Sequence, residues 1–259
     1  LAGSWKFRPA QVTALVLDDN KNQRPTLLYN AMIAPLQPLP LRGVIWYQGE
    51  SNAGSVEQAL RYREQFPAMI RQWRAQWNAP QLPFLWVQLA SWHSGGDQGD
   101  TSPWAVLRES QTATLSLPAT AEAVAIDIGD VADIHPTNKQ DVGKRLALAA
   151  RRVAYGERVV DSGPAFAGAT FDEGAATLRF EGDGLAVRGG GALQGFALAG
   201  ADRVFHPAVA VIEGVHVRVR SDAVAEPVAV RYAWSDAPVD ANLVGARGLP
   251  ASPFRSDEW

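Results

Sequence analysis

Short apolar runs alternate with segments of helical periodicity over the first 155 residues of the chain. The runs are residues 42–48 (RGVIWYQ), 83–90 (PFLWVQLA) and 121–128 (AEAVAIDI). Each is rich in β-branched or aromatic residues and bounded by Gly, Pro or polar residues, which is typical of buried strands in a parallel sheet. Because helical segments separate the runs, the pattern predicts βαβ units and a three-layer α/β sandwich.

Two helices stand out between and after these runs. Apolar residues recur at helical spacing over residues 56–77, with Arg and Glu between them. Pro67 lies inside this segment, so we expect a kink or a split into two helices there. A second helix is predicted to begin at Thr137, where the sequence TNKQ has the form of a capping box, and to end at Gly156.

The pattern changes after about residue 160, where helical periodicity gives way to alternation. Val215, Val217 and Val219 alternate with polar residues, as on a strand with one buried face. Further strands are predicted at residues 175–180, 185–188 and 227–234. This part of the chain is therefore expected to be antiparallel and β-rich. Because no capped helix follows residues 189–191 (GGG), they are interpreted as a turn and not as a phosphate-binding loop.

Composition narrows the classes of protein and of site. The 259 residues carry 24 Lys and Arg against 27 Asp and Glu, for a formal charge of −3, and 47% are hydrophobic, a profile typical of soluble globular proteins. A pI of about 5.8 and the lack of like-charge blocks argue against nucleic acid or an anionic membrane as partner. The absence of cysteine excludes disulfides, thiol catalysis and Cys-ligated zinc. No apolar run is long enough to predict a membrane span.

Polar residues directly follow the first predicted strand, at the kind of position where open α/β sheets place their sites. Gln48, Gly49, Glu50, Ser51 and Asn52 form a turn that could aim backbone and side-chain N–H groups at one point, as an oxyanion site requires. The alternative is an ordinary strand-to-helix turn in which Ser or Asn caps the next helix.

A histidine with nearby carboxylates follows the third predicted strand. His135 lies two residues after Asp133 and five after Asp130, and a general base near neutral pH needs a carboxylate to orient it. A solvated loop histidine is the alternative. The remaining histidines lack this combination of strand end and carboxylates: His93, His206 and His216. No His-x-x-x-His or comparable spacing favours a metal site.

Two further hypotheses concern residues near these segments. Arg108 and Gln111 are three residues apart on a probable helix and so share a face, where they could anchor substrate, buttress the site or face solvent. The sequence GESNA superficially resembles the nucleophile elbow G-x-S-x-G, which keeps open an α/β-hydrolase with Ser51 as nucleophile. Ala53 at the second small position and the lack of a preceding glycine-rich oxyanion segment argue against that alternative.

Several motifs together resemble the sialate O-acetylesterase family of SGNH hydrolases. They span nearly the whole chain: LLYNAMIAPL at 27–36, GVIWYQGESNA at 43–53, FPAMIRQWR at 66–74, LRESQ at 107–111, DIHPTNKQDVGKRLALAA at 133–150 and GLPASPFRSDEW at 248–259. The resemblance implies a flavodoxin-like parallel sheet in a three-layer fold. It also implies removal of O-linked acetyl groups from a sugar through a Ser acyl-enzyme, without metal or organic cofactor.

The resemblance also assigns roles to residues. His135 is similar to the general base, and Asp133 to the residue that orients it. Since the family pattern is Asp-x-x-His and Ala132 occupies that position, Asp130 remains an alternative. The expected oxyanion-hole residues are Asn52, Gln48 and Gly49, with Ser51 packing or capping. The candidate substrate-binding residues are Glu50, Arg108, Gln111 and Trp92.

The family's nucleophile motif, of the type G-Q-S-N, is absent from the 259 residues. Together with Leu1 in place of Met, this leads us to expect an N-terminal segment of the same enzyme that carries the serine. By resemblance, residues 1–25 end an inserted β region, residues 26–158 are the C-terminal part of the hydrolase domain, and residues 159–259 form a β-rich domain. The expected partner is an acetylated carbohydrate of sialic acid, xylan or xyloglucan type, and the expected location is periplasmic or extracellular. A non-catalytic carbohydrate-binding protein is the alternative from another class.

Overall fold

The computed structural model describes residues 24–95 and 101–259, and the chain divides into the units Leu1–Pro40 and Leu41–Trp259. In the described part of the first unit, the π-helix η2 (Tyr29–Ile33) continues into the 3₁₀ helix η3 (Ala34–Leu36). The Gln37 amide donates a hydrogen bond to the Tyr29 hydroxyl at 2.5 Å. The prediction of an inserted β region at residues 1–25 falls almost entirely outside the described residues.

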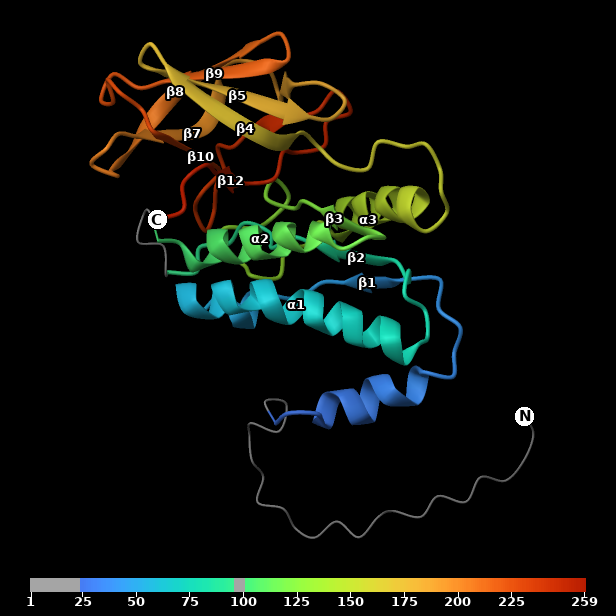
Figure 1. Ribbon diagram of the computed structural model, residues 1–259. Helices are drawn as coiled ribbons and strands as arrows, with labels where there is room; N and C mark the ends of the chain where they lie inside the picture. The colour runs from blue at the N-terminus through green and yellow to red at the C-terminus, as the bar shows by residue number, and fades with distance from the viewer. Residues whose placement is uncertain (1–23, 96–100) are drawn as a thin grey trace, which may run out of the picture. The chain divides into compact units, whose positions relative to one another are not determined.

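A parallel sheet forms one part of the second unit (Figure 1). Its strands β1 (Val44–Trp46), β2 (Phe84–Val87) and β3 (Thr120–Ala123) lie in that order, with Val44 beside Phe84 and Phe84 beside Thr120. All three match the predicted apolar runs but are shorter, because each run continues into the loop that leaves the sheet. Among the described residues no strand pairs with the outer edge of β1, and Ile45 there is 68% exposed.

Helices α1 (Val56–Gln76) and α2 (Pro103–Ala113) pack against each other and against one face of this sheet. The predicted split at Pro67 is wrong, since α1 runs through it as one helix. Proline removes a single backbone donor. Pro67 is buried beside Phe66, whose ring lies 5.2 Å from that of Trp86, so tertiary packing offsets the lost hydrogen bond.

Helix α3 (Lys139–Val153) packs against the other face of the sheet. The predicted cap, Thr137, is wrong by one residue, because the Asn138 side chain accepts the N–H of Asp141 at 3.2 Å and donates to its carboxylate at 2.9 Å. Asn caps a helix as well as Thr does, so local preference could not separate the two. The helix ends close to the predicted Gly156, whose φ of +71° suits a C-terminal turn.

The rest of the chain is β-rich, as predicted. A seven-stranded antiparallel sheet has the order β12-β10-β7-β8-β9-β5-β4, and β11 pairs with β6 separately. The strands are β4 (Ala165–Asp172), β5 (Ala175–Glu181), β6 (Ala186–Val187), β7 (Leu193–Ala199), β8 (Phe205–Glu213), β9 (His216–Arg220), β10 (Ala229–Tyr232), β11 (Leu243–Val244) and β12 (Phe254–Arg255). The predicted strands match β5, β6, β9 and β10, whereas β4, β7, β8, β11 and β12 were not predicted. The GGG segment is a turn, with φ between +73° and +79°.

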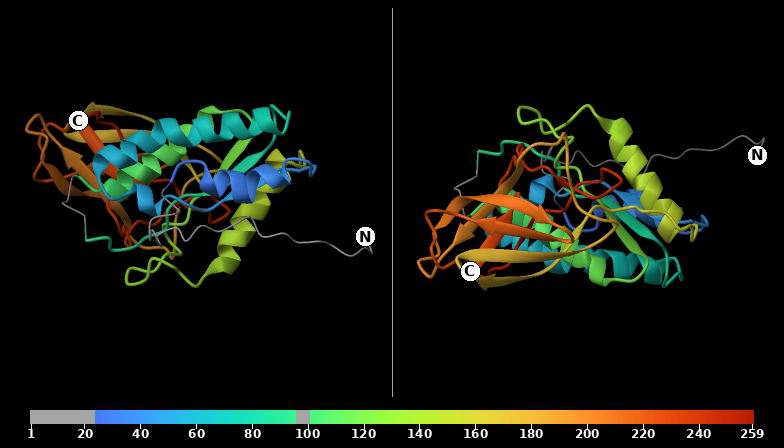
Figure 2. Two further views of the ribbon diagram at one scale, coloured as in Figure 1. Left: turned by 90° about the horizontal axis from the view of Figure 1, so that it is seen from below. Right: turned by 90° about the horizontal axis from the view of Figure 1, so that it is seen from above.

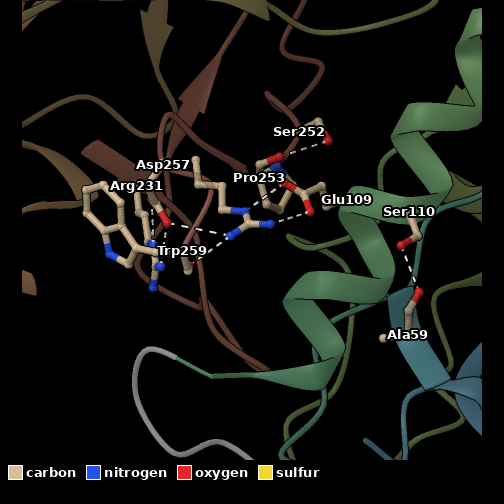
Figure 3. A network of polar contacts seen from close by, with 9 residues as sticks. Ala59, Glu109, Ser110, Arg231, Ser252, Pro253, Asp257 and Trp259 are labelled. Carbon is tan, nitrogen blue, oxygen red and sulfur yellow. Dashed lines mark hydrogen bonds and ion pairs between the residues drawn. The ribbon is translucent and has the colours of Figure 1, made fainter. Parts of the chain in front are cut away.

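The β-rich part is tied to α2 by its C-terminal segment (Figures 1 and 2). The Arg255 guanidinium donates to both carboxylate oxygens of Glu109 on α2, at 2.8 and 3.0 Å. Next to it, the buried Arg231 pairs with Asp257 at 2.7 Å, and Figure 3 shows Glu109 facing this segment. The predicted boundary near residue 158 therefore lies inside one compact unit, Leu41–Trp259.

Candidate active site

The turn after β1 is built around Gly49. Its φ is +153°, and an added Cβ would lie 2.8 Å from Leu107 Cδ2 and 3.2 Å from the Gln111 amide nitrogen. Only glycine fits this close approach to α2. The turn continues as the 3₁₀ helix η4 (Glu50–Asn52), and the Gly49 amide N–H has no acceptor among the described residues.

A relay of hydrogen bonds fixes the orientation of the amides in this turn. The Trp46 indole donates to the Tyr62 hydroxyl at 3.3 Å, so that hydroxyl donates its own proton to Gln48 Oε1 at 2.9 Å. Burial, and to a lesser extent the Glu50 charge, raises the pKa of Tyr62 to about 12, which keeps it a donor near neutral pH. Gln48 Nε2 then donates to Asn52 Oδ1 at 2.9 Å. The Asn52 amide nitrogen is left without an acceptor among the described residues.

The turn does not cap α1 with Ser51 or Asn52, which corrects that alternative. The cap is Ser55, whose side chain accepts the Gln58 N–H at 3.2 Å. Ser51 is exposed, and no hydrogen bond joins it to His135 within the described ranges. Glu50 is partly buried in the same turn. A nucleophile elbow needs a base at its serine, and this arrangement does not supply one.

His135 lies in the loop between β3 and α3, with Asp133 beside it. The Asp133 carboxylate accepts the backbone N–H of His135 at 2.8 Å and lies 3.7 Å from Nδ1 of the same residue. Asp130 instead accepts the N–H of Ala132 at 2.9 Å. The geometry therefore favours Asp133 over Asp130 as the orienting carboxylate. The His135 side chain is 87% exposed, so little holds the imidazole in place.

A cation–π contact relates the loop of His135 to the turn of Gln48. Lys139, the first residue of α3, holds its ammonium 4.8 Å from the centre of the Tyr47 ring. Tyr47 directly precedes Gln48, and Lys139 lies four residues after His135. The two segments that the sequence singled out therefore lie at the same edge of the sheet, where its strands end.

Arg108 and Gln111 buttress this region and do not face it. The Arg108 guanidinium donates to the carbonyls of four residues, and Gln111 accepts the Leu89 N–H at 3.0 Å and donates to the Gln48 carbonyl at 3.2 Å. The four carbonyls belong to Leu89, Ala90, Ser235 and Asp236. Both side chains are fully buried, which favours the buttressing role over contact with substrate.

Trp92 is half buried and packs on Trp104, with the ring centres 5.1 Å apart. Because Trp104 is buried, only the accessible part of the Trp92 ring is open to contact with substrate.

The residue that sequence reasoning missed is Tyr62. It lies three residues after Ala59 and four before Phe66, so its position on the buried face of α1 was readable from the helical spacing. Nothing in a single sequence distinguishes a core tyrosine from one whose hydroxyl orients a polar turn.

Glu122 on β3 is a second buried group with an unusual pKa. Burial raises it from 4.5 to about 7, despite hydrogen bonds from Trp86, Thr112 and Ser252 that favour the charged form. The folded protein therefore retains a proton that the unfolded chain releases at lower pH. The protonated Glu122 makes its full contribution to the free energy of unfolding below about pH 4.5. That contribution is lost as the pH rises to about 7.

We expect the free energy of unfolding to fall with pH over this window by up to about 1.4 kcal/mol per unit, and Glu122→Gln to flatten that slope. Urea unfolding at several pH values measures it. Glu57→Gln, at an exposed carboxylate of α1, is the control and should retain the slope. Parallel pH dependences in Glu122→Gln and the wild type would contradict the assignment.

Comparison with known proteins places these segments in a family. The model of the carbohydrate esterase family described as sialic acid-specific acetylesterase matches residues 17–152, just over half of the chain. The chain belongs to this family. The match includes both the turn at Gln48–Asn52 and the loop of His135.

Relatives of this esterase family match over different spans. Sialate O-acetylesterase from Mus musculus is 40% identical over 154 residues, which are 52% of this chain and 27% of that protein. The Homo sapiens protein of the same name is 39% identical over 150 residues, 51% of this chain and 28% of that protein. The chain thus spans little more than a quarter of these relatives.

The crystal structure of a carbohydrate acetylesterase from Xanthomonas citri is 66% identical and superimposes with a TM-score of 0.91. It covers 93% of this chain, and this chain covers 56% of it. The similarity therefore extends beyond the family model into the β-rich part.

No described helix has the length and apolar character to cross a membrane. No three His, Asp or Glu side chains in residues 24–95 and 101–259 are grouped to hold a metal ion.

Proposed function

We propose that this chain supplies the general base and the oxyanion-binding turn of a serine esterase that removes acetyl groups from carbohydrate hydroxyls. The observation that carries the proposal is the placement of His135 and Asp133 at the same edge of the sheet as two N–H donors, those of Gly49 and of the Asn52 amide. Neither donor has an acceptor among the described residues. The family and the names of its relatives support the reaction class. The proposed fold is the three-layer SGNH hydrolase sandwich, supported by α1 and α2 on one face of the parallel sheet and α3 on the other.

The reaction proceeds in two halves. A serine hydroxyl attacks the acetyl carbonyl carbon while His135 takes its proton, and the oxyanion that forms accepts hydrogen bonds from the Gly49 N–H and the Asn52 amide. The intermediate collapses, the ester C–O bond to the sugar breaks, and His135 returns the proton to the departing sugar oxygen. Water then attacks the acetyl-enzyme with His135 as base, releasing acetate and the free serine.

The orientation of both partners follows from the contacts above. Since Nδ1 of His135 lies 3.7 Å from Asp133, a small rotation of the exposed imidazole forms the hydrogen bond that holds its tautomer. The relay from Trp46 through Tyr62 and Gln48 turns the Asn52 amide nitrogen outward as a donor. Each oxyanion donor of this kind is worth roughly 3 kcal/mol of transition-state stabilisation in comparable enzymes.

The nucleophile is proposed to be a serine outside residues 1–259, next to the exposed His135 and the open edge of β1. Two observations support this: the uncovered Ile45 on that edge and the greater length of the Xanthomonas citri relative. Acetate release measured on acetylated sialic acid, xylan and xyloglucan identifies which acetylated sugar is the substrate.

A fluorophosphonate probe tests where the nucleophile lies. We expect residues 1–259 alone to remain unlabelled and to release no acetate from p-nitrophenyl acetate. A longer form of the protein should be labelled at one serine, identified by mass spectrometry of the labelled peptide. Ser51→Ala should leave both labelling and turnover of that form unchanged. Label on Ser51 would instead support the nucleophile elbow, and a protein that binds acetylated glycan without any label would favour a non-catalytic role.

A further inference from the structure

A cavity of about 230 Å³ lies where the parallel sheet meets the β-rich part of the chain. Its walls come from the end of α2, from β3, from the segment between α3 and β4, and from the C-terminal segment. It shares no lining residue with the turn at Gln48–Asn52 or with the loop of His135. It is therefore separate from the proposed active site.

One polar group in the cavity wall centres on Glu122. Its carboxylate accepts from the Thr112 hydroxyl at 3.0 Å and from the Gln88 amide at 2.9 Å. The same amide nitrogen lies 2.7 Å from the Ser252 hydroxyl. These side chains come from four separate segments, so the chain assembles a polar cluster where sheet and β-rich part meet. Behind it, the buried Gln88 Oε1 has no hydrogen-bond partner in the described part of the chain.

A second polar group in the wall is the carboxylate of Asp161. Its side chain is only 7% exposed, and Oδ1 pairs with the Arg152 guanidinium at 2.6 Å. The other oxygen, Oδ2, is buried and has no hydrogen-bond partner among residues 24–95 and 101–259. Buried carboxylate oxygens are normally satisfied by a donor, so this oxygen needs one.

The remaining walls are apolar. They include the rings of Phe166 and Phe254, which stack in parallel with centres 4.1 Å apart, together with Pro250, Pro253 and Val124. The cavity therefore combines acceptor oxygens with flat apolar surface. Both are features that complement a small ring bearing hydroxyl groups.

We propose that this cavity binds a small, neutral, hydroxyl-rich molecule, a pentose or hexose monomer. A hydroxyl group supplies the donor that Asp161 Oδ2 lacks, while the C–H face of a sugar ring packs on the apolar walls. A cation is disfavoured because Arg152 already neutralises Asp161, and an anion finds no unpaired positive charge, since Arg152 is the only Lys or Arg among the described residues of the lining. The volume lies below that of sites for larger ligands, so a monomer fits and a polysaccharide chain does not.

Ligand-observed saturation-transfer NMR with D-xylose and D-glucose tests this site on the folded protein. We expect saturable binding of at least one of the two sugars. Asp161→Ala and Ser162→Trp, the latter at an exposed lining position, should each weaken it at least about tenfold. Asp222→Asn, at an exposed carboxylate outside the cavity, is the matched control and should bind like the wild type. Circular dichroism verifies that each variant is folded.

The same experiment separates this cavity from the proposed active site. Binding should persist in His135→Ala, which removes the proposed base and touches no residue of the cavity. Sugar binding lost in His135→Ala but retained in Ser162→Trp would overturn the assignment. So would binding of D-glucosamine or D-glucuronate in preference to the neutral sugars, or no saturable signal with either neutral sugar.

Discussion

His135→Ala is expected to lower acetate release by about 10²- to 10⁴-fold without unfolding the protein, since a positioned general base contributes about that much. The loss should appear in kcat, because the imidazole moves a proton in the transition state and adds little to substrate binding. The side chain is 87% exposed, so the free energy of unfolding should change by less than about 0.5 kcal/mol. Acetate release by the form that carries the fluorophosphonate-reactive serine is the measurement.

His93→Ala is the matched control for this experiment. His93 is also an exposed loop histidine, and its only hydrogen bond among those described is from its backbone N–H to the Val131 carbonyl, which alanine retains. It should keep wild-type turnover. Turnover should be lowered in Asp133→Asn, as in His135→Ala, whereas Asp130→Asn should keep wild-type turnover. Equal losses in Asp130→Asn and Asp133→Asn, or full turnover in His135→Ala, would contradict the roles assigned to this loop.

Arg108→Met is expected to lower the free energy of unfolding by about 3–5 kcal/mol, with a Tm lower by about 10 °C. Methionine fills most of the space but removes hydrogen bonds to four backbone carbonyls, three of them buried, which lie 2.7 to 2.9 Å from the guanidinium. Two follow β2 and two lie in the loop after β10. Urea and thermal unfolding of the variant measure the effect.

Arg71→Met provides the comparison, because Arg71 is exposed on α1 and its loss should cost less than about 0.5 kcal/mol. Arg108→Lys should recover only part of the stability, since an ammonium cannot reach carbonyls on both sides as a planar guanidinium does. If Arg108→Met unfolded like Arg71→Met, the carbonyls would be satisfied without the guanidinium.

The strand ends were predictable because the signals are local. Apolar runs bounded by Gly and Pro placed β1, β2 and β3 within a few residues, and the polar residues after them follow directly along the chain. Gln48 and His135 lie at the same edge of the sheet because both follow the carboxyl ends of parallel strands. The cap at Asn138 was missed for the opposite reason, since two adjacent residues with similar capping preference cannot be separated without the packing of α3.

Long-range pairs account for what could not be predicted. The burial of Arg108 depends on carbonyls 127 and 128 residues away, and Glu122 depends on Ser252. No periodicity within either segment reports such partners. Tyr62 is an intermediate case, because its helical position was readable but its bond to Gln48 was not. The eight-residue strand β4 was missed since its residues are only partly buried or exposed, with little contrast in the sequence.

Arg108 and Arg255 also decide whether the C-terminal hundred residues can be treated as an exchangeable accessory module. Each joins α2 to a loop or strand of the antiparallel region, and one of them lies entirely inside the protein. A chimera joined near residue 158 would therefore inherit unsatisfied groups on both sides of the junction. Recombination of this architecture, in the laboratory or in evolution, should retain α2 and residues 235–257 from the same parent.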